Sequence, residues 1–207
     1  MLDEVVERLE PPRGRAPLSA YATAALEQAD QQARAKPVVV VAHSAGGAIA
    51  AQLMAQAGDR VVGVLGVCAV IPRPGRSFAA TMPLPARALL PVMLRLAGTR
   101  PPDGAIRKGL GAGLPEDVVR GLVEDYAAES RALFLGRTGA PVLPPVRRYL
   151  LATRDREVPP AVQRRSAATL QAQHVTEVTT GHLPLLEDPD AVLRELQEQE
   201  LLDHVGD

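Results

Sequence analysis

Four consecutive valines, Val38 to Val41, lead within three residues to a serine flanked by small residues, and an alanine-rich stretch follows at once. A buried strand, a sharp turn and a helix in this order are typical of a nucleophile elbow, a variant of the motif G-x-S-x-G. The turn is so tight that the residues two before and two after the serine must be small, which Ala42 and Gly46 are. The pattern predicts that Ser44 is a nucleophile above a sheet, beside a helix N-terminus that favours negative charge. The alternative is a chance turn in which Ser44 only caps a helix.

The composition predicts a single domain without a charged macromolecule as partner. A chain of 207 residues, 46% of them hydrophobic, is long enough to bury one sizeable core. A net charge of −1 and a pI near 6.4 give no reason to expect nucleic acid or a membrane as partner. The single cysteine, Cys68, lies in an apolar run, which predicts a buried, inert thiol. We expect a cytoplasmic protein, because no disulfide can form within the chain and residues 1–16 lack the apolar segment of a signal peptide.

The spacing of apolar residues predicts strands that alternate with helices. The Val61–Val70 run lacks the alternation of a half-buried strand, as expected where helices cover both faces of a parallel sheet. The order of elements therefore predicts an α/β fold with a parallel sheet. Strands are expected at Val38–Val41, Val61–Val70, Arg147–Thr153 and His174–Val178, and helices at Leu2–Glu10, Ser19–Ala35, 46–57, 160–172 and from Asp188 onward.

The middle of the chain, residues 72–145, differs in character from the rest. Prolines punctuate short helical pieces, of which one is expected at 86–97 and another from Pro115. A segment of this length is too long for a simple connection between core strands. We expect a helical cap at 72–145 that sits over a site, inserted into an α/β core made of residues 1–71 and 146–207.

Two further segments place catalytic types of side chain directly after expected strands. Asp155 follows the third strand and His182 follows the last one. Because the carboxyl ends of parallel strands meet at one edge of a sheet, Ser44, Asp155 and His182 are expected to converge there. His182 would accept the serine proton, Asp155 would orient the imidazole, and the Ala45 N–H would bind an oxyanion. The alternatives are Glu157 as the acid, or Asp155 as a solvated charge and His182 as a packing residue.

Other side chains are candidates for lesser roles. His43, next to the serine, is a candidate substrate contact, although a structural neighbour is the commoner role for such a residue. Phe78 and Phe134 are candidate aromatic contacts in the cap, although its apolar helix faces are better explained by packing. No group of His, Cys, Asp and Glu has metal-ligand spacing, and no glycine-rich phosphate loop occurs. We therefore expect neither a metal nor a cofactor.

These motifs together make the chain resemble the α/β-hydrolase superfamily, and within it the small-esterase and hydroxynitrile-lyase-like branch. The resemblance implies a serine hydrolase that cleaves esters of small or medium apolar substrates through the same three residues. It defines the mechanism better than the substrate, because relatives perform lyase, lactonase or thioesterase chemistry on the same triad. The matching segments cover nearly all of the chain from about residue 19 onward, and they are Pro37–Gly47, Val61–Gly75, Arg148–Gln163 and Gly181–Pro189.

The chain departs from this family at its N-terminus. Members carry four strands before the strand that leads to the nucleophile, and these include a His-Gly loop that supplies a second oxyanion N–H. Only 36 residues precede Pro37, and none of them resembles that loop. We therefore expect an N-terminally shortened version in which Val38–Val41 is an exposed edge strand. Such an edge could pair two copies in a homodimer, or could serve a non-catalytic binding or assembly module, which is the alternative to an enzyme.

Overall fold

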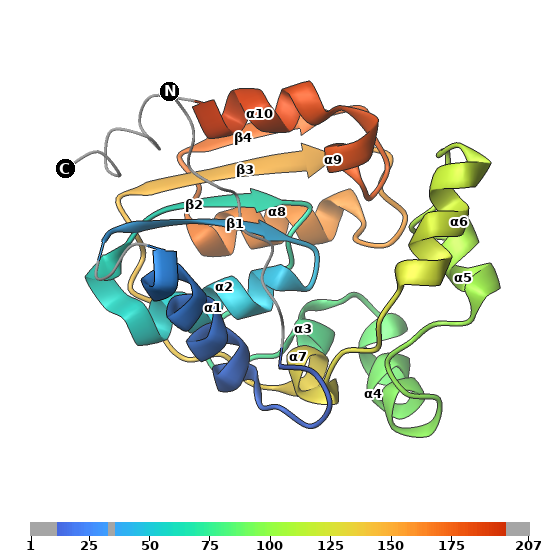
Figure 1. The fold of residues 1–207 in the computed structure, drawn as a ribbon, viewed down its shortest axis with the longest axis horizontal. Helices are drawn as coiled ribbons and strands as arrows, with labels where there is room; N and C mark the ends of the chain where they lie inside the picture. The colour runs from blue at the N-terminus through green and yellow to red at the C-terminus, as the bar shows by residue number, and fades with distance from the viewer. Residues whose placement is uncertain (1–11, 33–35, 198–207) are drawn as a thin grey trace.

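The computed structural model describes residues 12–32 and 36–197. A four-stranded parallel sheet runs through its centre, and its strands lie side by side in the order in which they occur in the chain (Figure 1). The predicted α/β fold with a parallel sheet is confirmed, while the predicted helix at Leu2–Glu10 lies outside the described residues. The strands are β1 (Val38–His43), β2 (Val61–Val67), β3 (Val146–Ala152) and β4 (His174–Val178).

Helices cover both faces of the sheet, and this explains why its central strands lack an alternating pattern. On one face, three helices (α1, α2 and α8) pack against side chains such as Val64 and Leu151. On the other face, α10 packs against Leu65 and Leu150. Successive residues of one strand, such as Val64 and Leu65, are therefore buried on opposite faces of the sheet. The helices of this core are α1 (Leu18–Gln32), α2 (Gly46–Ala57), the 3₁₀ helix η1 (Gly58–Arg60), α8 (Pro160–Leu170), α9 (Pro184–Glu187) and α10 (Pro189–Gln197).

Strand β2 ends at Val67, three residues earlier than predicted. Cys68 adopts a left-handed backbone conformation, with φ of 48°, which ends the extended run. The Val70 N–H then donates to the carbonyl of Ser44 at 2.9 Å, so the chain after β2 folds against the predicted nucleophile. Cys68 itself is fully buried, and burial raises the pKa of its thiol, in agreement with the expected inert cysteine.

Between β2 and β3 the chain forms a helical insertion, as predicted. Two of its helices, α5 and α6, lie beyond the tips of the strands in Figure 1. Val119 and Val123 of α6 are buried, whereas α4 buries only Leu94 and exposes most of its large apolar side chains. The division of the chain into core and cap at 72–145 stays a prediction. The helices of the insertion are α3 (Phe78–Thr81), α4 (Ala86–Leu96), α5 (Asp103–Lys108), α6 (Glu116–Asp125) and α7 (Arg131–Leu135).

Strand β1 is an edge of the sheet among the described residues, as predicted for the Val38–Val41 run. The side chain of Val41 is 42% exposed, although Val38 and Val40 pack against the core on the opposite face. The Ser44 N–H donates to Val67, and backbone groups alternate in direction along a strand, so the N–H of Val41 points away from β2. The edge therefore offers both backbone donors and apolar side chains.

From this edge we expect a homodimer in which β1 pairs with its own copy across a two-fold axis. Val41→Lys should give a monomer, because a lysine on an edge strand opposes pairing with another strand. Val142→Lys is the matched control, since Val142 is also exposed, at 47%, but lies outside the sheet. Light scattering after size-exclusion chromatography measures the mass, and a monomeric wild type would contradict the prediction.

In the part of the chain that the structure describes, no helix is both long enough and apolar enough to cross a membrane.

Candidate active site

Ser44 lies in the turn between β1 and α2 and has a φ of 53°, in the left-handed region. A non-glycine residue is strained there, and the surrounding bonds hold it in place. Its carbonyl accepts from the N–H groups of Gly47 at 3.1 Å and Val70 at 2.9 Å. The predicted nucleophile elbow is therefore present as a strand, a strained turn and a helix.

The steric demand of the turn falls on a different glycine from the one predicted. A Cβ added at Gly46 would have no neighbour within 4 Å, so the requirement for a small residue two positions after the serine is wrong in this structure. A Cβ added at Gly47 would lie 2.4 Å from the carbonyl oxygen of Val70. The close approach of the chain after β2 thus explains the second glycine of the Gly-Gly pair.

Three side chains from separate loops meet at the carboxyl edge of the sheet. His182, after β4, has its Nε2 2.8 Å from the Ser44 Oγ. Its Nδ1 lies 2.7 Å from Oδ2 of Asp155, which follows β3. His182 and Asp155 are each only 4% exposed. The structure brings together the three residues that we expected to converge, in a continuous line of hydrogen bonds from hydroxyl to carboxylate.

Asp155 accepts hydrogen bonds on both oxygens, so the loop after β3 fixes its direction. Oδ1 accepts from the N–H groups of Glu157 at 2.8 Å and Val158 at 2.9 Å. Oδ2 accepts from the Gln163 amide at 3.0 Å in addition to the imidazole. The alternative acid, Glu157, contributes its backbone N–H while its side chain is exposed.

Gln163 belongs to the site although our residue-by-residue reasoning gave it no role. It lies on the buried face of α8, is fully buried, and also bonds both backbone groups of Ala152 at the end of β3. The signal for it is a large polar side chain on the buried face of α8, which also contains Val162, Ser166, Ala167 and Leu170. A polar residue on such a face must have buried partners.

His43 contacts the catalytic histidine through the backbone. Its Nε2 lies 2.7 Å from the His182 carbonyl oxygen, and the two ring centres are 4.8 Å apart. Burial, together with the nearby His182, lowers the pKa of His43 to about 4, while Asp155 opposes the shift. A neutral imidazole therefore donates Nε2–H to His182. Through this bond His43 supports the loop that carries His182. Its candidate role as a substrate contact stays a prediction.

We expect the burial of His43 to make stability fall in mild acid. Its pKa is about 4 when folded and 6.5 otherwise, so the unfolded chain binds more protons between these values. The neutral, buried imidazole makes its full contribution to the free energy of unfolding well above pH 6.5. As the pH falls from about 7.5 to 5, roughly 2 kcal/mol of that free energy should be lost. His43→Gln keeps an amide donor that does not titrate and should remove this part of the pH dependence. Urea unfolding of both proteins measures it, and equal slopes with pH would contradict the prediction.

The remaining predicted residues surround the serine. Ala45 directly precedes α2, where backbone N–H groups have no partner within the helix and can bind an oxyanion. Phe78 and Phe134 contact each other edge to face, with ring centres 5.5 Å apart. Both belong to an apolar cluster that includes Ala45 and Val158. The structure therefore brings the two aromatic rings into the packing next to the nucleophile, and their contact with a substrate stays a prediction.

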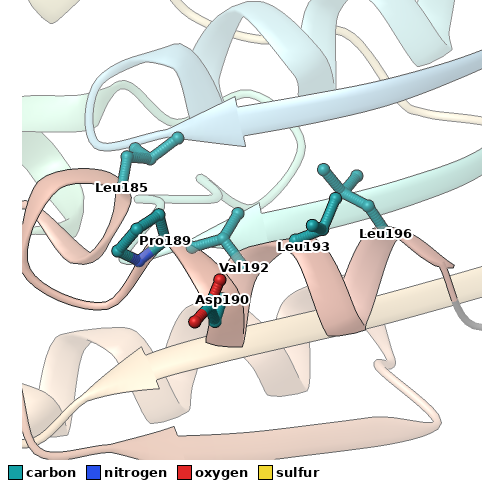
Figure 2. Close-up of a pocket in the computed structure, with 6 residues that line it drawn as sticks. All are labelled: Leu185, Pro189, Asp190, Val192, Leu193 and Leu196. Carbon is teal, nitrogen blue, oxygen red and sulfur yellow. The ribbon is translucent and has the colours of Figure 1, made fainter.

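An apolar depression lies elsewhere on the surface. It has a volume of about 290 Å³ and lies along α9 and α10, with Leu185, Leu193 and Leu196 on its wall (Figure 2). None of the three converging side chains lines it. We therefore do not assign substrate binding to this depression. No cluster of His, Cys, Asp and Glu able to hold a metal occurs within residues 12–32 and 36–197.

A parallel α/β core with a serine on a strained strand–turn–helix, in line with a histidine and an aspartate, defines the class of hydrolase-type α/β proteins. The chain belongs to the alpha/beta hydrolase family, whose sequence model matches residues 8–195. Among curated proteins no match was found.

Solved structures share the fold at low sequence identity. An extracellular alpha/beta-hydrolase from a Paenibacillus species has a TM-score of 0.73 at 16% identity, covering 93% of this chain and 81% of its own. A pyrethroid hydrolase from Sphingobium faniae has a TM-score of 0.64 at 21% identity, covering 89% and 78%. A thermophilic esterase from Thermogutta terrifontis has a TM-score of 0.60 at 20% identity, covering 93% and 75%. At these identities the likeness shows the fold alone, and this chain is shorter than each of the three.

Proposed function

We propose that the protein is a serine hydrolase that cleaves carboxylic esters of small or medium apolar substrates. The observation that supports this most is the pair of hydrogen bonds of 2.8 and 2.7 Å that links Ser44 to His182 and His182 to Asp155. A hydroxyl is a weak nucleophile unless a base takes its proton, and this arrangement supplies the base and its orienting acid.

The reaction would proceed in two halves. Ser44 Oγ attacks the ester carbonyl while its proton passes to Nε2 of His182, and the Ala45 N–H donates to the oxyanion. The imidazolium then gives the proton to the leaving alcohol, which leaves an acyl group on Ser44. A water molecule, deprotonated by the same imidazole, attacks the acyl group, and the returned proton restores the Ser44 hydroxyl as the acid departs. Asp155 stays ionised throughout and stabilises the imidazolium.

The surroundings of the serine support an apolar substrate. The cluster next to it contains Phe78, Phe134, Ile49 and Val158, and it offers hydrophobic side chains rather than charges. Proteins with this fold include one described as a pyrethroid hydrolase and one described as an esterase, which agrees with ester cleavage. The buried, unpaired Cys68 agrees with a cytoplasmic location.

Labelling by a fluorophosphonate probe tests the proposal, together with hydrolysis of p-nitrophenyl butyrate. We expect the wild type to react with both, Ser44→Ala to react with neither, and His182→Ala to react far more slowly. Ser19→Ala is the control, because Ser19 is an exposed serine on α1 and should keep full reactivity. A folded wild type that neither labels nor hydrolyses would reject the enzyme in favour of a binding or assembly module. Labelling without ester turnover would instead direct the search to lyase, lactonase or thioesterase substrates.

A further inference from the structure

Helix α4 in the insertion has an apolar stripe on its outer surface. The stripe consists of Leu89, Val92, Met93 and Leu96, which are 53%, 51%, 59% and 84% exposed. Their spacing of three, four and seven residues places them on one face of the helix. Leu84, just before the helix, adds a further side chain that is 66% exposed. A concentration of large exposed apolar groups on a folded surface marks an interaction site rather than chance.

The other side of α4 is already used for packing. Leu94 is buried, and Leu90 packs against the cluster that contains Phe78, Phe134 and Ala45. The helix is therefore held against the protein by one apolar face while a second apolar face is exposed to solvent. Packing among residues 12–32 and 36–197 does not account for the stripe.

The two charged residues of α4, Arg87 and Arg95, are both positive. Residues 82–102 contain three arginines and no aspartate or glutamate. Arg87 and Arg95 are exposed and form no ion pair with any described residue, whereas Arg100 is paired with Asp103. The net charge of the whole chain, −1, gives no reason to expect an anionic membrane as partner, but it does not reveal the local excess of positive charge in this segment.

This charge pattern distinguishes between two candidate partners for the stripe, a second copy of the chain and a lipid surface. A second copy docked on α4 would cover the stripe but would offer Arg95 no counter-charge, because α4 contains no aspartate or glutamate. An anionic lipid surface satisfies both features, because it accepts apolar side chains among its acyl chains and attracts arginines to its headgroups.

We propose that α4 docks the protein, lying in the plane of the interface, on an anionic lipid bilayer. The stripe enters the boundary between headgroups and acyl chains, and Arg95, which flanks the stripe beside Leu96, contacts the lipid phosphates. Because the inner face of α4 packs on the cluster next to Ser44, docking brings the apolar surroundings of the serine close to a lipid phase. The docking surface itself does not depend on the proposed hydrolase activity.

Co-sedimentation with vesicles tests the proposal. The wild type should bind phosphatidylglycerol vesicles and bind phosphatidylcholine vesicles much more weakly. Leu96→Glu should weaken binding to phosphatidylglycerol by roughly tenfold or more, and Arg95→Gln by a few-fold. Val142→Glu places the same charge on an exposed valine outside the helices and strands and should bind like the wild type. Ser44→Ala should also bind like the wild type, so failure of docking and failure of catalysis can be told apart.

Three results would overturn the proposal. The first is a wild type that does not bind, or that binds both kinds of vesicle equally. The second is a loss of binding in Val142→Glu as large as in Leu96→Glu. The third is self-association of the wild type in light scattering that Leu96→Glu abolishes and Val41→Lys leaves intact, since the stripe would then be a contact between copies. Far-ultraviolet circular dichroism confirms that each variant is folded before binding is compared.

Discussion

Replacement of Asp155 by asparagine is expected to lower kcat by about 10⁴-fold while the fold persists. In the wild type, the carboxylate accepts Nδ1–H of His182, which leaves Nε2 free to accept the Ser44 proton. An asparagine amide that donates to Nδ1 stabilises the opposite tautomer, in which Nε2 carries hydrogen and cannot act as a base. The N–H groups of Glu157 and Val158 still hold the side-chain oxygen, so the loop should keep its position although the Gln163 amide loses its acceptor.

The matched control for this prediction is Glu157→Gln. Glu157 lies two residues from Asp155 and was the alternative acid, yet its side chain is exposed and only its backbone N–H contacts the aspartate. We expect its kcat to stay within a few-fold of the wild type. Steady-state hydrolysis of p-nitrophenyl butyrate measures both variants, and thermal unfolding checks that they fold alike. A large loss in Glu157→Gln with little loss in Asp155→Asn would reverse the assignment of the acid.

Several elements could be predicted from the sequence because their signals are local. Helix α2 spans the predicted residues 46–57, since a small-residue turn begins it and Gly58, with φ of 54°, follows its last residue. Strand β4 matches its prediction because three of its five residues, Val175, Thr176 and Val178, are β-branched and polar loops flank it. The convergence of Ser44, Asp155 and His182 was also predictable, because the carboxyl ends of parallel strands meet at one edge.

Features that depend on distant contacts could not be predicted in the same way. The end of β2 at Val67 depends on the backbone of Cys68, which lies within an apolar run and gives no local signal of a turn. The bond between His43 and the His182 carbonyl joins residues 139 positions apart. The exposure of the α4 stripe could not be predicted from the sequence either, because an apolar helix face has the same residue spacing whether it is buried or exposed.

A buried ion pair leads to the largest expected effect on stability. Arg148 of β3 and Glu195 of α10 are each 6% exposed, and Nε lies 2.9 Å from the carboxylate. Thr176 donates to the other carboxylate oxygen at 2.6 Å, so the glutamate is bonded on both sides. Glu195→Ala would leave the guanidinium buried without a counter-charge. We expect the free energy of unfolding to fall by about 3–5 kcal/mol, measured by urea denaturation.

Two comparisons separate this cause from a general loss of packing. The double variant Arg148→Met with Glu195→Leu removes both charges and fills similar volume, so it should recover most of the lost stability. Glu177→Ala removes one partner of the exposed pair with Arg164 and should change stability little, because water already screens both charges. If the double variant is as unstable as Glu195→Ala, the unpaired charge is not the cause. The stability that α10 gives to the sheet would then come from its apolar face, where Val192 packs on β2 and β3.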